Sequence, residues 1–266
     1  MHHISYIALC SDMHIVEPGQ KLMGLDTSLR AAALAKALRN EPVRLEFVAC
    51  LGDLCDTVST PNRGEAVATR SAYAHAREIL GQLPAPLISL PGNHDHPAIM
   101  SEEFPAEWSS SHSGVSQLLI NGTQVIGIDV RTGPEATGEL SLESLRQLEA
   151  SLHSCQRAII LSHNPLFSLD SPRCNSALSV TNRGALAPIL ERHRNKVLGL
   201  FHGHLHLWIA AALGGITSYC VPSASFGFSL EPLSSEREAL SATPVGYLLV
   251  GLGDDGSLFV RPRFTG

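Results

Sequence analysis

The chain has 266 residues, and its Asp and Glu residues outnumber its Lys and Arg residues, for a formal net charge of −6. Hydrophobic residues make up 44% and charged residues 17%, a composition that excludes a disordered chain. The acidic balance argues against the basic surface that binds nucleic-acid polymers, so we expect no such partner.

Short apolar, β-branched runs recur along the first two hundred residues and predict strands. These runs cover residues 4–10, 44–51, 85–90, 123–130, 157–162 and 196–201. Stretches with helical spacing cover residues 28–40, 65–83, 141–153 and 182–194. Asp26 and Thr27 stand before the first of these as candidate N-caps, and Ser141 opens the third. Strands that alternate with helices favour an α/β fold.

The pattern changes after residue 207, where no long helix is indicated. Apolar runs at 207–223, 245–253 and 257–264 are predicted to be consecutive antiparallel strands. Turns are expected at Gly214-Gly215 and Asp255-Gly256. We therefore expect the second half to form a mixed or antiparallel sheet that packs on the first. Two long irregular stretches, 166–181 and 223–243, have no role that the sequence assigns.

Cysteine usage and the N-terminal residues favour a cytoplasmic protein. The six cysteines include no CxxC pair and are too few for a disulfide scaffold, and Cys10 and Cys50 are expected to pack as small apolar residues. The first residues, MHHISYIALCSD, lack the basic start and the long apolar run of a signal peptide. No stretch approaches the roughly 18 apolar residues of a membrane span, so we expect no membrane partner.

Residues that can bind metals follow five of the predicted strands directly. They are Asp12 and His14, then Asp53 and Asp56, then Asn93, His94 and Asp95, then His163, and finally His204 and His206. In open α/β sheets, sites form outside the carboxyl ends of the strands. We therefore expect these side chains to meet at one edge of the fold.

Each of these groups on its own also has a plain structural explanation. Asp and His are common in turns, and a glycine followed by two aspartates is a frequent turn sequence. Five such groups in the same structural context are far harder to explain in that way. Mn, Fe and Zn accept carboxylate oxygen together with imidazole nitrogen, and a carboxylate can bridge two ions. Two ions about 3.5–4 Å apart can hold both oxygens of an in-line displacement at phosphorus.

The chain resembles the calcineurin-like metallophosphoesterases. Its motifs stand in the order of that family: DxH at 12–14, GDxxD at 52–56, GNHD at 92–95, a late histidine at 163 and GHxH at 203–206. The resemblance implies an α/β fold with four layers, an α/β/β/α sandwich of two mixed β-sheets flanked by helices. It also implies one domain over residues 1–266.

The resemblance further implies a site with two divalent or trivalent metal ions, Mn, Fe or Zn. One metal would be bound by Asp12, His14, Asp53 and His206, and the other by Asp53, Asn93, His163 and His204. Asp53 would then bridge the two ions, and a hydroxide between them would attack phosphorus. His94 would act near the phosphate on the leaving oxygen, Asn93 and His94 would contact substrate, and Asp95 would orient His94.

Within the family, the chain is most similar to the class III cyclic-nucleotide phosphodiesterases. GIDV at 127–130, GEL at 138–140 and the following Gln147-Leu148 carry this resemblance. Two positions depart from it: the usual HHPP is replaced by SHNP at 162–165, and Met13 stands where a small residue is usual. Asn62, Arg63 and His96 are weaker candidates for substrate contacts.

We therefore expect a phosphodiesterase that acts on cyclic nucleotides or other small phosphodiesters. A phosphomonoesterase or a nucleotide pyrophosphatase of the same fold is the alternative. A protein phosphatase fits less well, because Thr57 and Val58 stand where that branch has Arg-Gly after GDxxD, and a DNA-repair nuclease would carry a basic surface. A non-catalytic scaffold would have lost ligands, whereas every ligand position here holds a suitable residue. The resemblance leaves a homodimer open.

Overall fold

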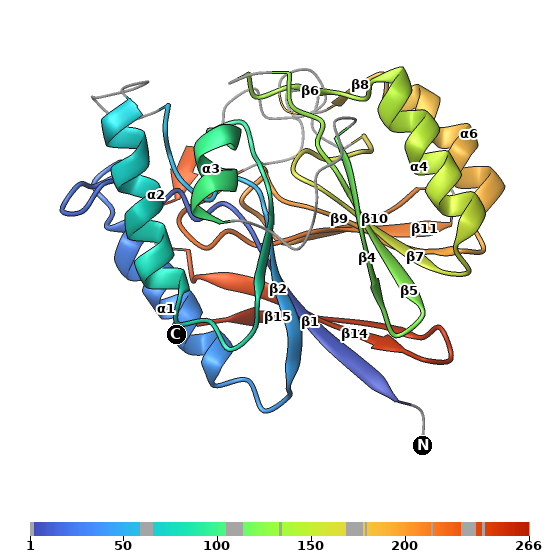
Figure 1. Ribbon diagram of the computed structural model, residues 1–266, viewed down its shortest axis with the longest axis horizontal. Helices are drawn as coiled ribbons and strands as arrows, with labels where there is room; N and C mark the ends of the chain where they lie inside the picture. Colours follow the sequence, from blue (N-terminus) through green and yellow to red (C-terminus); the bar gives the residue numbers. More distant parts are fainter. Residues whose placement is uncertain are drawn as a thin grey trace.

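The computed structural model describes residues 3–58, 66–104, 114–132, 135–168, 178, 180–213, 215–229, 238–240 and 243–265. Two β-sheets stand between two groups of helices, one group on each side of the molecule (Figure 1). The four-layer sandwich of two mixed sheets that the resemblance implies is therefore confirmed.

The first sheet has five strands in the order β15-β14-β1-β2-β3. Its parallel part consists of β1 (Ile4–Cys10), β2 (Leu45–Leu51) and β3 (Leu87–Leu90). The C-terminal hairpin of β14 (Gly246–Gly253) and β15 (Leu258–Phe264) adds to it, because β14 runs antiparallel to β1. Both ends of the chain thus contribute to one sheet.

The second sheet has six strands in the order β10-β11-β9-β7-β5-β4. They are β4 (Val115–Ile120), β5 (Thr123–Ile128), β7 (Ala158–Ser162), β9 (Val197–His202), β10 (Ile209–Leu213) and β11 (Ile216–Cys220). The second half therefore supplies a mixed sheet that packs on the first, as expected, but the strands after residue 207 do not all lie in it. The β10–β11 hairpin joins the second sheet through a parallel pairing of β11 with β9, whereas β14–β15 joins the first.

Helices cover the outer face of each sheet. Those beside the first sheet are α1 (Thr27–Arg39), α2 (Ala66–Leu80) and α3 (Pro97–Glu103), and those beside the second are α4 (Leu142–Ser154) and α6 (Arg183–His193) (Figure 1). The helix α1 begins at a cap, since the Asp26 carboxylate accepts a hydrogen bond from the Leu29 amide. Its buried side chains recur at helical spacing, which gives it one apolar stripe.

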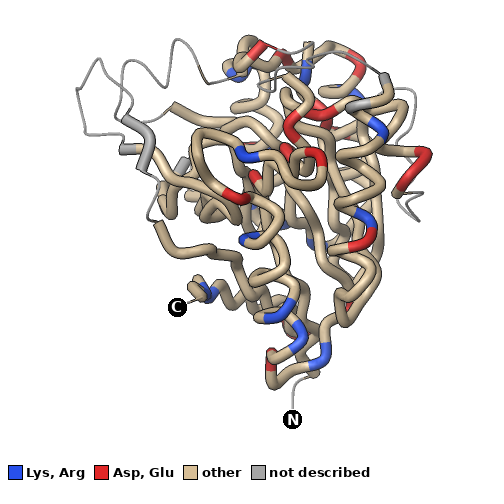
Figure 2. The backbone as a smooth tube through the Cα atoms, turned by 90° about the vertical axis from the view of Figure 1, so that its left-hand side faces the viewer, with Lys and Arg blue, Asp and Glu red and all other residues tan. Residues whose placement is uncertain are grey.

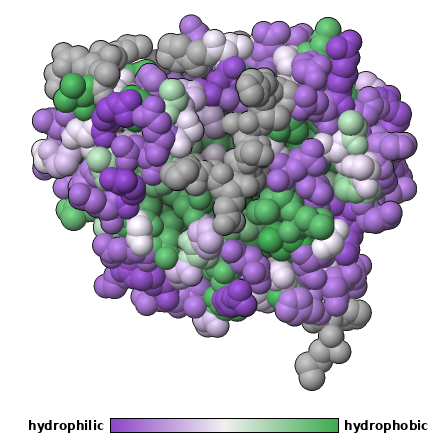
Figure 3. All heavy atoms as spheres, in the orientation of Figure 1, coloured by the Kyte–Doolittle hydropathy of each residue, from purple (hydrophilic) through white to green (hydrophobic). Residues whose placement is uncertain are grey.

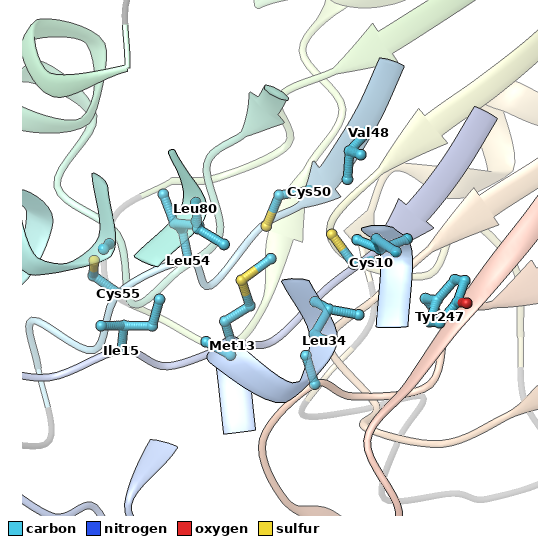
Figure 4. Packing of buried hydrophobic residues seen from close by; sticks show 14 of the residues in the cluster. Cys10, Met13, Ile15, Leu34, Val48, Cys50, Leu54, Cys55, Leu80 and Tyr247 are labelled. Carbon is cyan, nitrogen blue, oxygen red and sulfur yellow. The ribbon is translucent and has the colours of Figure 1, made fainter. Parts of the chain in front are cut away.

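Alternation along the strands divides the core between the layers. In β1, Ile7 and Leu9 point between the two sheets, and Ala8 and Cys10 point toward the helices. Figure 4 shows Cys10 and Cys50 among apolar neighbours in the layer between the first sheet and its helices. Both thiols are buried, as expected, and burial together with their contact raises the pKa of Cys50. They therefore serve as small apolar residues.

Smaller elements complete the fold. Short pairs form between β6 (Gly138–Glu139) and β8 (Val180–Thr181), and between β12 (Gly227–Ser229) and β13 (Glu238–Leu240). The sequence patterns predicted neither α3, which has seven residues, nor β4. No helix within the described ranges is long and apolar enough to span a membrane.

Candidate metal centre

The predicted ligands meet where the carboxyl ends of strands from both sheets face each other. Strands β1, β2 and β3 supply the loops of one side, and β7 and β9 supply those of the other. Although all seven side chains are polar, none is more than 5% exposed: Asp12, His14, Asp53, Asn93, His163, His204 and His206. Figure 2 shows a group of acidic positions in the upper part of the fold, among these loops, while Lys and Arg positions are scattered.

The backbone of these loops is in an uncommon conformation. Among the eight described non-glycine residues with positive φ, five are predicted ligands: Asp12, His14, Asp53, His204 and His206. Positive φ costs energy for an L-residue, and such strain concentrates at functional sites. Since β9 ends at His202, His204 and His206 lie in a loop, not in a strand, and both can turn toward the centre.

Two motif glycines allow the loops to approach one another closely. A Cβ added at Gly92 would lie 2.2 Å from Asp53 Oδ1, and one at Gly203 would lie 1.9 Å from Ser11 Oγ. The φ of Gly203 is not positive, so close approach of the loops, not a left-handed turn, requires glycine there. Any side chain at either position would displace the acids of the centre.

The first group of side chains surrounds His14. Its Nε2 lies 3.2 Å from His206 Nε2 and 3.5 Å from Asp53 Oδ2. His206 Nε2 lies 3.2 Å from Asp12 Oδ1. One ligand atom from each of these four residues falls within 4.8 Å of the others, a spacing that could hold one metal ion.

The second group surrounds His163 and shares Asp53 with the first. His163 Nε2 lies 3.4 Å from Asp53 Oδ2, 3.2 Å from Asn93 Oδ1 and 3.1 Å from His204 Nδ1. The other carboxylate oxygen, Asp53 Oδ1, accepts a hydrogen bond from the His94 amide at 2.8 Å. A single oxygen of Asp53 therefore faces both groups.

The far nitrogens of the histidines show that this donor set fits metal cations. His163 Nδ1 lies 2.7 Å from the Leu51 carbonyl oxygen, and His206 Nδ1 lies 2.7 Å from the Phe226 carbonyl oxygen. A carbonyl oxygen only accepts, so each Nδ1 carries a proton, and the Nε2 of each ring faces the centre, where it can bind a cation. The Nδ1 of His14 donates to Asp56 Oδ2 in the same way. Lone pairs that converge at about 3 Å repel unless a cation lies between them.

The charges of the cluster favour that cation. Burial acts to lower the pKa of His163, but the neighbouring Asp53 and Asp12 carboxylates overcome it and raise this pKa to about 9. Burial acts to raise the pKa of Asp53, yet His163 and His14 hold it well below its usual range. Ionised carboxylates and imidazole nitrogens that attract positive charge make a binding site for divalent metals.

Asp56 connects this cluster to His94, and we had not assigned it a role. Its Oδ2 lies 3.1 Å from His14 Nδ1 and 3.2 Å from His94 Nδ1, and its side chain is buried. Burial acts to raise the pKa of Asp56, but hydrogen bonds from the two imidazoles keep it low. The second acid of GDxxD was the available signal: the sequence placed it among the residues that can bind metals but not beside His94.

The prediction that Asp95 orients His94 is wrong. Asp95 Oδ2 accepts hydrogen bonds from the amides of Gly92 and Leu54, and Oδ1 accepts from the Cys55 amide and the Tyr73 hydroxyl. Its side chain therefore fastens the GNHD loop to the GDxxD loop. Burial and the nearby Asp53 carboxylate raise its pKa.

Other residues singled out in the sequence lie elsewhere. His96 is exposed, and its Nδ1 caps α3 by accepting from the Ile99 amide, so it does not line the pocket described below. Met13 is fully buried in the core and does not form the pocket floor. Asn62 and Arg63 fall outside the described residues.

A pocket of about 360 Å³ opens onto the centre. Residues of the motifs line it: His14, Asp53, Asp56, Asn93, His94, His204 and His206. Residues that no sequence motif indicated also line it: Lys21, Leu22, Met23, Ala136, Phe226 and Phe228. Lys21 and Met23 are exposed and mark its mouth. A volume of this order suits a small molecule.

Comparison with known proteins agrees with this geometry. The family model for calcineurin-like phosphoesterases matches residues 5–207. The 3′,5′-cyclic adenosine monophosphate phosphodiesterase of Escherichia coli is 27% identical over 260 residues, which cover 93% of this chain and 85% of that protein. A probable cyclic nucleotide phosphodiesterase of Rhodopseudomonas palustris is 26% identical over 212 residues, covering 77% and 73%.

Solved structures share the fold at lower identity. A dimetal phosphatase of Danio rerio superposes with a TM-score of 0.65 at 15% identity, covering 98% of this chain and 99% of that one. Two sheets with their flanking helices therefore follow the same path in both chains.

Proposed function

The chain belongs to the calcineurin-like phosphoesterase family, and we propose that it is a two-metal phosphodiesterase for small phosphodiesters, with cyclic nucleotides as its substrate class. The family makes the chain a hydrolase with a dinuclear metal centre. The substrate class is supported by similarity to the 3′,5′-cyclic adenosine monophosphate phosphodiesterase of Escherichia coli and the probable cyclic nucleotide phosphodiesterase of Rhodopseudomonas palustris.

The observation that carries the proposal is the position of Asp53 Oδ2. This oxygen lies 3.5 Å from His14 Nε2 and 3.4 Å from His163 Nε2, the central nitrogens of the two groups. We assign one metal to Asp12, His14, Asp53 and His206, and the other to Asp53, Asn93, His163 and His204. Bound metal ions would activate a water and neutralise charge on phosphate. Mn, Fe and Zn all suit these ligands.

The side chains beside the metals would position and protonate the substrate. His94 lines the pocket with a partly exposed ring, and Asp56 accepts from its Nδ1, which orients the ring. We assign to its Nε2 the transfer of a proton to the departing oxygen. Asn93 brings its amide to the same end of the pocket and is placed to contact phosphate.

Two wider proposals go with this one. We propose that residues 1–266 form one domain, supported by the pairing of β14 with β1, which joins the last strands to the first. We also propose a cytoplasmic location, supported by the free thiols of Cys10, Cys50, Cys55, Cys155 and Cys220. The homodimer stays a prediction.

A substrate panel with Mn²⁺-reconstituted protein tests the function. The panel contains 3′,5′-cyclic AMP, bis(p-nitrophenyl) phosphate, p-nitrophenyl phosphate and a nucleoside diphosphate compound. We expect kcat/KM to be highest for the diesters and lost in an Asp53→Ala variant. A preference for the monoester or the pyrophosphate would favour a phosphomonoesterase or a nucleotide pyrophosphatase instead of a diesterase. No hydrolysis of any compound would reject the proposed function.

A further inference from the structure

A tight turn at the mouth of the pocket has an unexpected residue at its tip. Leu22 and Leu25 exchange both backbone hydrogen bonds, each 2.9 Å long, so that Met23 and Gly24 form a two-residue loop. The φ values are +51° at Met23 and +80° at Gly24. Two left-handed residues are typical of the type I′ turn, which favours Asn-Gly and disfavours a long side chain at its first position.

The same chain contains a turn of this kind with the usual residues. In the β4–β5 hairpin, Ile120 pairs with Thr123 across Asn121 and Gly122, whose φ values are +47° and +73°. Asparagine adopts this conformation readily, whereas methionine adopts it at an energetic cost. The turn at residue 23 therefore gains nothing in backbone stability from its methionine. Strain of this sort indicates a function for the side chain.

The surroundings of Met23 indicate that function. Its side chain is 58% exposed and lines the pocket, on a molecule whose visible face is mostly hydrophilic (Figure 3). Leu22 holds the base of the turn in an apolar cluster with Phe226 and Phe228. Contacts of Leu22 with Phe226 and Phe228 thus fix the position of the turn, while the thioether of Met23 stays accessible to a ligand.

Phe228 provides a second apolar surface beside the metal centre. The centroid of its ring lies 4.8 Å from that of His206 and 5.3 Å from that of the buried Phe226. The two phenylalanine rings are nearly perpendicular. These contacts set its orientation, and the ring remains partly exposed at the pocket. Lys21 adds a positive charge to the same mouth, which favours an anionic ligand.

We propose that Met23 and Phe228 form the subsite for the nucleobase of a nucleotide whose phosphate lies at the metal centre. This inference rests on the proposed function and adds the residues that select the organic part of the substrate. Thioethers and aromatic rings make favourable contacts with flat aromatic groups. A strained, exposed methionine and an oriented phenylalanine that line the same pocket offer such a group apolar contacts.

Calorimetric titration of the Mn²⁺-reconstituted protein with AMP and with ribose 5-phosphate tests the subsite, because these ligands differ only in the base. We expect AMP to bind the unchanged protein about tenfold more tightly, within the range of a contact of this type. Met23→Asn and Phe228→Ala should each remove most of that difference without weakening ribose 5-phosphate. Met23→Leu and Phe228→Tyr are the matched controls and should retain it.

Thermal unfolding separates a ligand contact from a packing role. Asparagine suits the turn, so Met23→Asn should raise Tm even as the preference for AMP falls. The subsite would be overturned if the unchanged protein bound AMP and ribose 5-phosphate equally well, or bound neither. It would also be overturned if Met23→Asn kept the preference for AMP or had a lower Tm. A preference for AMP without hydrolysis in the substrate panel would support the subsite and reject the proposed function.

Discussion

Asp53 carries more of the proposed chemistry than any other side chain of the centre. One of its oxygens is held by the His94 amide, and the other faces both histidine groups. Replacement by alanine would remove the carboxylate oxygen that faces both His14 Nε2 and His163 Nε2. The two metals are therefore expected to be lost together.

Asp53→Ala should lower the metal content of the reconstituted protein to background and abolish diester hydrolysis. Elemental analysis after gel filtration measures the first effect, and release of p-nitrophenol measures the second. Asp254→Ala, in an exposed loop, is the control and should retain both. If Asp53→Ala keeps one metal in full, the bridging assignment is wrong.

His94 and Asp56 are expected to act on rate and not on metal binding. His94→Ala should keep the metals and lower kcat by roughly 10²–10⁴-fold, as is typical when general acid–base help is lost. Metal loss in this variant would make His94 a ligand instead.

Asp56→Asn should also lower kcat, because the carboxylate that accepts from His94 Nδ1 and orients the ring is lost. If Asp56 acts through His94, the double variant His94→Ala/Asp56→Asn should be no slower than His94→Ala alone. The double-mutant cycle compares kcat of the unchanged protein, the two single variants and the double variant, with metal content as the control. Additive losses would show that Asp56 acts mainly by holding His14.

The identities of the residues in the centre could be predicted because each follows a predicted strand. Their partners could not, because hydrogen bonds depend on how separate loops approach each other. Asp95 follows His94 in the chain, yet its carboxylate accepts from the GDxxD loop, while Asp56 reaches the His94 ring. No sequence motif indicated the positive φ values of the ligands or the residues at the mouth of the pocket.

At the scale of elements, strands and long helices were predictable and their sheet partners were not. The run at 4–10 became β1 with the same bounds, and 28–40 differs from α1 by one residue at each end. The C-terminal runs were correctly predicted as strands, but alternation of polar and apolar residues says nothing about which sheet a hairpin joins. The antiparallel pairing of β14 with β1 is a long-range contact of this kind.

The loop after β3 depends on a glycine that no larger residue can replace. Gly92→Ala would place its Cβ 2.2 Å from Asp53 Oδ1 and 2.4 Å from the Asp53 amide nitrogen. We expect loss of metal and a destabilisation of about 1–3 kcal/mol, the usual cost of overpacking. Denaturant unfolding and elemental analysis measure the two effects.

Gly184→Ala is the matched control for that variant. A Cβ at Gly184 in α6 meets no atom within 4 Å, and alanine favours helix by about 0.5–1 kcal/mol. This variant should unfold at equal or higher denaturant and keep its metals. If Gly92→Ala behaves like Gly184→Ala, the loop has more room than the structure indicates.

At the scale of the whole molecule, the centre joins two sheets that pack on each other mainly through apolar side chains. The ligands Asp12, His14, Asp53 and Asn93 come from loops of the first sheet, and His163, His204 and His206 come from loops of the second. Metal binding should therefore stabilise the packing of one sheet on the other. It should also relieve the repulsion between converging lone pairs.

Removal of metal with a chelator is accordingly expected to lower Tm, and Mn²⁺ should restore it. Metal at about a thousand times its Kd contributes roughly 4 kcal/mol to folding, which corresponds to several degrees in a chain of this size. Differential scanning fluorimetry measures the shift, with Asp53→Ala as the control because it should not respond to Mn²⁺. The bridge makes the two sites interdependent, so the rise in Tm should disappear with that single carboxylate. An equal rise in both proteins would place the stabilising metal outside the centre.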